Sequence, residues 1–151
     1  DEFLIAHRTL TDTGYRHYEV SNYGLPGREA VHNAAYWRRA PYLGLGPSAH
    51  SASDTSRWWN LREWSAWSRA IEADQPAVDG REELDPTAVS LEDVYLGLRT
   101  DLGVAEEVIP EAVASEWARE GWAHRQGSRL RLTPEGWLRL DSLVSGLSKS
   151  R

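Results

Sequence analysis

The most regular stretch of the sequence lies near its end and fixes the order of the elements there. Two short runs with alternating apolar residues, 122–125 and 130–132, flank a Gln126-Gly127 turn, which is typical of a β-hairpin. Thr133-Pro134-Glu135 follows, and a hydroxyl residue before proline and glutamate is a common helix start. We therefore predict a two-stranded wing followed by a last helix.

Two further helices are predicted before this hairpin. Asp85-Pro86 begins a pattern of apolar residues that runs to Arg99, and a second pattern at 110–120 ends at Gly121. The order helix, helix, wing, helix predicts a mostly helical, winged-helix-like domain over 86–151. The segment 74–85 is rich in proline, glycine and acidic residues, so we interpret it as a connector between domains.

The first part of the chain, 1–73, has a different pattern. Helix is predicted over 2–13, strand over 15–21, helix over 29–37 and a short buried strand over 42–46. Alternating helices and strands are typical of α/β layers. Loops are expected at 22–27 and 49–57, and a helix after Asn60 carries Trp64 and Trp67 on its apolar face. The fold class expected for the whole chain is therefore α/β followed by α+β.

Cysteine and methionine are both absent from the 151 residues. Without cysteine the chain has no disulfide, no thiolate nucleophile and no thiolate ligand for zinc or an iron-sulfur cluster. The sequence starts at Asp1 inside a helical pattern rather than at methionine, so we expect it to be a piece of a longer protein. The piece alone is expected to be catalytically inactive and to bind no cofactor by itself.

The net charge of −6 is unevenly distributed along the chain. Residues 51–151 hold twelve Lys and Arg against eighteen Asp and Glu, whereas the first 50 residues are balanced. Nucleic-acid affinity comes mainly from cationic side chains, so we expect no nucleic-acid partner. No apolar run reaches the length of a membrane span and no signal peptide is evident, which predicts a soluble, cytoplasmic protein.

Most residues that could bind a cofactor or take part in a reaction lie between 18 and 51. Tyr18-Glu19-Val20-Ser21-Asn22-Tyr23 leads to a box, His32-Asn33-Ala34-Ala35-Tyr36-Trp37, and then to Tyr42-Leu43-Gly44-Leu45-Gly46-Pro47-Ser48-Ala49-His50-Ser51. These segments resemble the end of the barrel in the coproporphyrinogen III oxidase-like family of radical S-adenosylmethionine (SAM) proteins. The His-Asn-x-x-Tyr-Trp box is similar to that of the heme chaperone branch of this family.

The resemblance implies a fold and a set of cofactors. Residues 1–73 would be the last strands and helices of an open, TIM-like radical SAM barrel, whose amino-terminal portion would be a partner missing from this chain. The intact protein would bind a [4Fe-4S] cluster, SAM and heme, and would transfer heme to acceptor proteins. The family's Cys-x-x-x-Cys-x-x-Cys motif is absent here, and Ser48 replaces a glycine that is usual in the family.

His32 is the candidate ligand of heme iron, because a neutral imidazole is the usual axial ligand. Tyr36 lies one helical turn further along, and Trp37 could form a wall of a porphyrin site. The alternative is structural: His32 hydrogen-bonds a nearby loop, while Tyr36 and Trp37 pack. The resemblance implies heme contact by the three residues, and both interpretations stay open.

Gly44, Gly46 and Ala49 are the candidates for contact with SAM. Bare glycines at the end of a strand permit close approach of a cofactor, and the same glycines also suit a crowded corner of a barrel. The resemblance implies that this segment borders the SAM pocket. We assign no catalytic residue to the chain.

Two rival interpretations remain. One is oxygen-independent coproporphyrinogen III oxidase activity in porphyrin biosynthesis, against which the His32 box argues. The other is a stand-alone winged-helix module that binds protein or DNA. Tryptophans that stack on bases would favour that module, but Trp64, Trp67, Trp117 and Trp137 all fall on apolar helical faces and are expected in the core.

Overall fold

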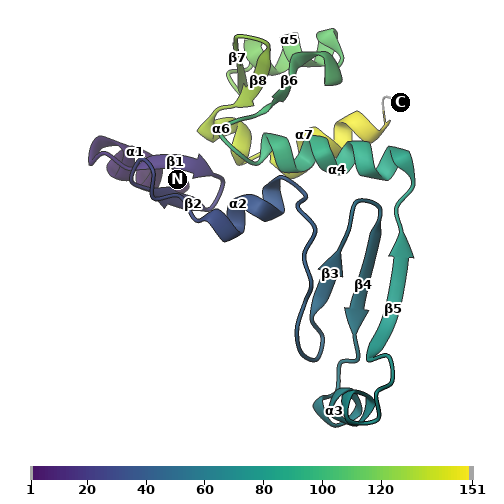
Figure 1. Cartoon of the computed structure of the whole chain (residues 1–151). Helices are drawn as coiled ribbons and strands as arrows, with labels where there is room; N and C mark the ends of the chain where they lie inside the picture. Colours follow the sequence, from purple (N-terminus) through teal and green to yellow (C-terminus); the bar gives the residue numbers. More distant parts are fainter. Residues whose placement is uncertain (1, 150–151) are drawn as a thin grey trace. The chain divides into compact units, whose positions relative to one another are not determined.

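The computed structural model of the chain describes residues 2–149, which pack as two units (Figure 1). The first unit combines the segment up to Arg38 with the segment from Leu91 onward, and the second unit is the stretch between them. The first unit contains the helices α1 (Glu2–Asp12), α2 (Val31–Trp37), most of α4 (Pro86–Leu98), α5 (Glu111–Arg119), α6 (Pro134–Trp137) and α7 (Leu140–Lys149), and the 3-10 turn Glu106–Val108. Its strands are β1 (Arg16–Glu19), β2 (Asn22–Gly24), β6 (Val104–Ala105), β7 (Ala123–Gln126) and β8 (Arg129–Leu132).

The hydrophobic core of the described residues belongs to the first unit. Leu98, Ala114 and Leu130 are fully buried, and they join α4, α5 and β8 in one cluster. The inner face of α7 completes this cluster, and Figure 1 shows α7 running alongside α4. The three-stranded sheet has the order β6-β8-β7, with the predicted hairpin as two of its strands.

The amino-terminal strand β1 is fastened to the turn that follows α4. The Val20 N–H donates to the Arg99 carbonyl and the Asp101 N–H donates to the Tyr18 carbonyl, each at 3.1 Å. Side-chain contacts reinforce this link, since Arg16 Nε lies 2.5 Å from Asp101 Oδ2. Segments that are about eighty residues apart in sequence therefore form one structural unit.

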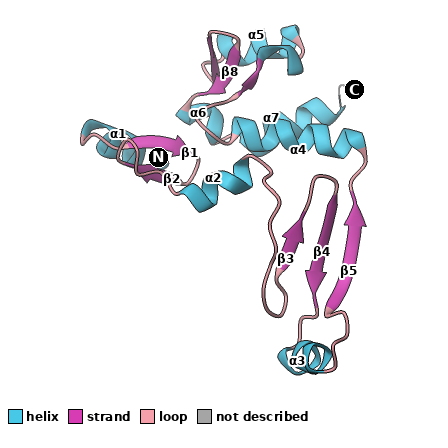
Figure 2. Cartoon of the chain, in the orientation of Figure 1, coloured by secondary structure: helices cyan, strands magenta, loops and turns pink. Residues whose placement is uncertain are grey.

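The second unit is a three-stranded antiparallel sheet with one helix. Its strands are β3 (His50–Ala52), β4 (Ser56–Asn60) and β5 (Val78–Glu83), and α3 (Trp64–Glu72) lies in the connection between β4 and β5 (Figure 2). Trp59 pairs with Gly80 across β4 and β5, and its ring covers that glycine. A Cβ atom on Gly80 would lie 2.3 Å from the Trp59 ring, so the sheet requires glycine there.

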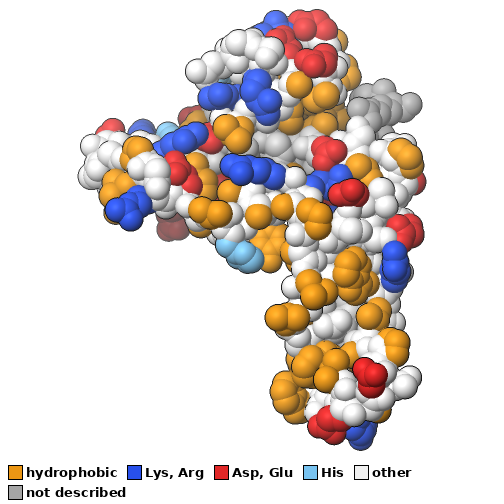
Figure 3. Space-filling model, viewed as in Figure 1, with side chains coloured by type: hydrophobic (Ala, Val, Ile, Leu, Met, Phe, Trp, Pro, Cys, Tyr) orange, Lys and Arg blue, Asp and Glu red, His pale blue; other side chains and the backbone are white. Residues whose placement is uncertain are grey.

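This second unit has almost no core of its own. Ala77, Ser51 and Ser56 are its buried residues within the described chain, whereas Trp64 is 66% and Leu45 84% exposed. The prediction that Trp64 packs in the core is wrong, while Trp117 and Trp137 are buried in the first unit as expected. Figure 3 shows hydrophobic side chains gathered on the visible surface of the second unit around α3.

Most of the predicted helices are confirmed, but the strands of the second unit were not foreseen. The strand expected at 42–46 is reduced to one isolated bridge between Tyr42 and Ala52. The loop expected at 49–57 contains β3 and the start of β4, and the connector expected at 74–85 contains β5. β5 is mostly polar, and the two tryptophans of β4 are adjacent rather than alternating, so local apolar alternation gave no signal for these strands.

Near the amino terminus the expected loop at 22–27 begins with β2, which pairs with β1 as a short hairpin. The described residues form a mixture of helices and small sheets with no closed barrel. The domain boundary predicted at 74–85 stays a prediction. None of the described helices combines the length and the hydropathy needed to cross a bilayer.

Candidate functional site

Helix α2 contains the histidine box, residues 32–37, and the side chains of the box lie on two different faces of the helix. His32 and Tyr36 lie four residues apart and therefore on the same face. Their ring centroids are 4.9 Å apart with an interplanar angle of 83°, an edge-to-face contact. His32 is exposed, and neither of its ring nitrogens has a hydrogen-bond partner among residues 2–149. This arrangement leaves an imidazole nitrogen open to an external ligand.

Trp37 lies on the other side of the same helix. The Arg99 guanidinium stands 4.6 Å from the centroid of its indole ring, within the range of a cation–π contact. The Trp37 Nε1 atom is buried and has no hydrogen-bond partner in the part of the chain that the structure describes. The structure therefore brings His32 and Tyr36 together but does not bring Trp37 to their face.

A buried carboxylate holds Arg99 against Trp37. Glu19 is fully buried on β1, and its Oε1 atom lies 2.6 Å from Arg99 Nε. Its Oε2 atom accepts hydrogen bonds from the Ser21 backbone N–H and from the Asn22 amide. Arg99 was missed as a functional residue, because its link to Glu19 depends on a long-range strand contact that no local pattern reports. Glu19, Arg99 and Trp37 form a stack that positions α2, and we call it the Glu19 stack.

Gly44, Gly46 and Ala49, the candidates for SAM contact, lie in the loop before β3. The Gly44 N–H donates to the Ser51 hydroxyl at 2.9 Å, and the Asn60 side-chain amide donates to the Gly46 carbonyl at 2.8 Å. Asn60 is thus the organising side chain of this loop.

The backbone structure of this loop explains why residues 44 and 46 are glycines. A Cβ atom on Gly44 would lie 2.1 Å from the His50 carbonyl oxygen, and Gly46 has a φ of +100°. The crowding at Gly44 comes from the chain itself, so the glycines alone do not identify a ligand site.

His17 forms the centre of an aromatic cluster on β1. Its ring stacks on Tyr23 at 4.0 Å and meets the Trp137 ring edge-on at 4.5 Å. The Nε2 atom lies 3.1 Å from the Val20 carbonyl oxygen, and the Nδ1 atom lies 2.9 Å from Nδ1 of His7. Burial lowers the pKa of His17, and the neighbouring His7 acts in the same direction. Since Nε2 must donate to the carbonyl, neutral His17 accepts the proton of His7 at Nδ1.

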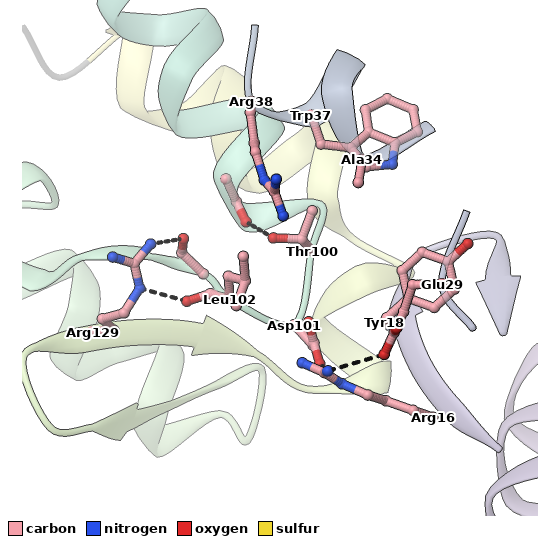
Figure 4. A pocket seen from close by; sticks show the side chains of 12 residues that line it. Arg16, Tyr18, Glu29, Ala34, Trp37, Arg38, Thr100, Asp101, Leu102 and Arg129 are labelled. Carbon is pink, nitrogen blue, oxygen red and sulfur yellow. Dashed lines mark hydrogen bonds and ion pairs between the residues drawn. The ribbon is translucent and has the colours of Figure 1, made fainter. Parts of the chain in front are cut away.

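A cavity of about 360 Å³ adjoins α2 on the side of Trp37 (Figure 4). Its lining comes from β1, α2, the turn after α4 and β8, and it includes Tyr18, Trp37, Arg38, Leu102 and Arg129. His32 does not line this cavity. Among the described residues, no group of three or more His, Asp or Glu side chains could hold a metal ion.

Comparison with known proteins identifies the family to which this chain belongs. A curated protein of Mycobacterium tuberculosis named heme chaperone HemW is 34% identical over 97% of this chain. A protein of Synechocystis with the same name is 36% identical over 79% of it. This chain belongs to the coproporphyrinogen III oxidase-like family of radical SAM proteins.

The chain spans about 40% of the length of the Mycobacterium relative and 29% of the Synechocystis one. A solved structure of a family member, the radical SAM enzyme coproporphyrinogen III oxidase (HemN) from Escherichia coli, superposes on 94% of this chain with a TM-score of 0.66. The two are 15% identical, so this match supports a common fold. The scan against protein-family models gave no match.

Proposed function

We propose that this chain is part of a heme chaperone in which His32 supplies an axial nitrogen to heme iron. The observation that carries the proposal is the exposed imidazole of His32, with both ring nitrogens unpaired in residues 2–149 and Tyr36 on the same helical face. A buried structural histidine has its nitrogens occupied, as His17 does. His32 has the opposite environment, and the relatives named heme chaperone support the same assignment.

The surroundings of His32 suit a flat apolar ligand. Val31 precedes it and is 85% exposed, so apolar surface lies next to the imidazole. Tyr36 packs edge-on against the ring and restricts its orientation. Trp37 contributes indirectly in this proposal, because the Glu19 stack fixes the helix that presents His32.

The other cofactors belong to the intact protein in this proposal. The chain has no cysteine, so thiolate ligands of a [4Fe-4S] cluster come from residues beyond it. The loop with Gly44, Gly46 and Ala49 is our proposed border of the SAM site. The Ser51 and Asn60 side chains form hydrogen bonds with its backbone. SAM would contact the outer surface of this loop.

We further propose that the second unit packs against the missing barrel portion of the longer protein. Its exposed Trp64, Leu43 and Leu45 would then be covered, which accounts for the absence of a core within the unit. The helices and sheet from α4 to α7 would be the winged-helix-like domain. A cytoplasmic location and heme-acceptor proteins as partners complete the proposal.

Oxygen-independent coproporphyrinogen III oxidase activity is the alternative. The chain shares the fold of the solved oxidase structure, but no residue that we identify in it specifically favours oxidase activity. The His32 box distinguishes the two proposals, since a porphyrinogen contains no iron and needs no axial ligand.

Hemin titration of the full-length protein tests the role of His32. We expect His32→Ala to shift the Soret band and to weaken hemin affinity at least tenfold, because the iron loses its axial nitrogen. The matched control is His124→Ala, which removes an exposed histidine on β7. Tyr36→Phe tests whether the neighbouring hydroxyl contributes.

An unchanged Soret position and affinity in His32→Ala would remove His32 as the ligand. Circular dichroism of each variant shows whether the protein is folded, so that lost affinity is not mistaken for a misfolded loop. A shifted Soret band in a folded His32→Ala protein supports the proposal.

A further inference from the structure

We infer that the cavity beside α2 binds a small organic anion with an apolar body, whose carboxylate pairs with Arg38. This site lies on the opposite face of α2 from His32, so the inference is independent of heme binding. Its volume of about 360 Å³ falls within the range of small-molecule sites.

The charges around the cavity are unbalanced. The lining holds three arginines against two acids, and Arg16 pairs with both acids, Asp101 at 2.5 Å and Glu29 at 3.2 Å. These are the two acidic residues of the described lining, and both are engaged with Arg16. Arg38 and Arg129 therefore have no acidic partner within the lining.

The two remaining arginines, Arg38 and Arg129, differ in whether their side-chain N–H groups are already hydrogen-bonded. Arg129 donates from Nε to the Leu102 carbonyl and from a terminal nitrogen to the Gly103 carbonyl, both at 2.6 Å. These neutral acceptors hold its side chain and leave its positive charge uncompensated. The Arg38 side chain has no hydrogen bond or ion pair with residues 2–149, and Figure 4 shows its guanidinium pointing into the cavity. Arg38 is thus the group with donors to offer a carboxylate.

The walls of the cavity select an apolar body rather than a bare ion. Tyr18 and Trp37 provide aromatic surface, and Ala34 and Leu102 provide aliphatic surface. Gly97 adds backbone with no side chain, because a Cβ atom there would lie 2.6 Å from Val104. An inorganic anion would leave these walls in water, whereas an aromatic carboxylate would cover them and still reach Arg38.

Two-dimensional NMR titration of the chain with 2-naphthoate provides the test. We expect shifts of the indole N–H signal of Trp37, which a Trp37→Phe variant identifies among the eight tryptophans. The neutral 2-naphthamide should bind about tenfold more weakly, because it lacks the charge that pairs with Arg38. Inorganic phosphate should cause no saturable shift at the same concentrations.

Arg38→Gln should weaken 2-naphthoate about tenfold and leave 2-naphthamide unchanged. The matched control is Arg28→Gln, which removes an exposed arginine between β2 and α2 that does not line the cavity. Equal binding of acid and amide, or an equal effect of the two arginine variants, would overturn the inference. Retained dispersion of the NMR spectrum shows that each variant is folded.

Discussion

At the scale of single residues, the buried carboxylate of Glu19 is the central electrostatic feature of the first unit. It compensates the charge of Arg99 and accepts hydrogen bonds from Ser21 and Asn22. Removing one partner of a buried pair leaves the other charge without compensation, which costs more than the pair contributes. The pair therefore determines whether α2 keeps its position over Arg99.

We expect Glu19→Ala to lower the free energy of unfolding by about 3 kcal/mol, because Arg99 loses its buried anion. Urea denaturation monitored by circular dichroism measures the change. Glu83→Ala is the control and should cost much less, since the Glu83 carboxylate pairs with Arg81 at an exposed position. Equal losses in the two variants would contradict the role given to the Glu19 stack.

His17 makes stability depend on pH. Its pKa is lowered by burial, so the unfolded chain binds a proton at His17 more readily than the folded chain does. Stability is then retained above the unfolded pKa of about 6.5 and decreases as the pH falls from there towards the lowered pKa of the folded state.

The expected result is a urea midpoint that falls between about pH 7 and pH 5, with a smaller fall in His17→Gln. Glutamine retains a polar side chain but does not titrate. His124→Gln, which removes an exposed histidine, should keep the wild-type slope. A His17→Gln protein with the same pH dependence as the wild type would exclude His17 as its source.

At the scale of secondary-structure elements, the β4–β5 pair depends on one close contact. Gly80 on β5 lies under the Trp59 ring, and a Cβ atom there would approach the ring to 2.3 Å. A methyl group at this position must displace the ring or separate the strands.

Gly80→Ala is therefore expected to destabilise the second unit by about 1–3 kcal/mol and to alter the near-ultraviolet circular dichroism of tryptophan. Asp79→Ala changes the neighbouring, exposed position on the same strand and should have little effect. A Gly80→Ala protein with wild-type stability and spectrum would show that the ring does not need this space.

The elements also show which parts of the structure a sequence can predict. The hairpin of β7 and β8 is local, so its turn residues and alternation predicted it. β5 was not predicted, because α3 separates it in sequence from its partner β4. Its own sequence, Val78-Asp79-Gly80-Arg81-Glu82-Glu83, is also mostly polar.

At the site, the residue types and their helix were predictable, but the surroundings of that helix were not. The spacing of His32 and Tyr36 implied a shared face. The position of Trp37 against Arg99 required the tertiary contact between β1 and the end of α4.

At the scale of the whole molecule, the first unit is assembled from two stretches that the second unit separates in sequence. The hydrogen bonds of Val20 and Asp101 close this long loop. Loop-closure entropy grows slowly with length, by about 0.6 kcal/mol for each doubling, so a long insertion at this point is thermodynamically tolerable. The cost of the arrangement is kinetic, because contacts between distant segments slow folding.

Because the first unit consists of two separate segments, the order in which they are synthesised affects the order in which their contacts form. When β1 and α2 leave the ribosome, the residues that hold them have not yet been translated. Glu19 remains without its arginine, and His17 without Trp137, until the chain beyond Leu91 has emerged. The amino-terminal segment of the first unit is therefore made first, but it forms its long-range native contacts last.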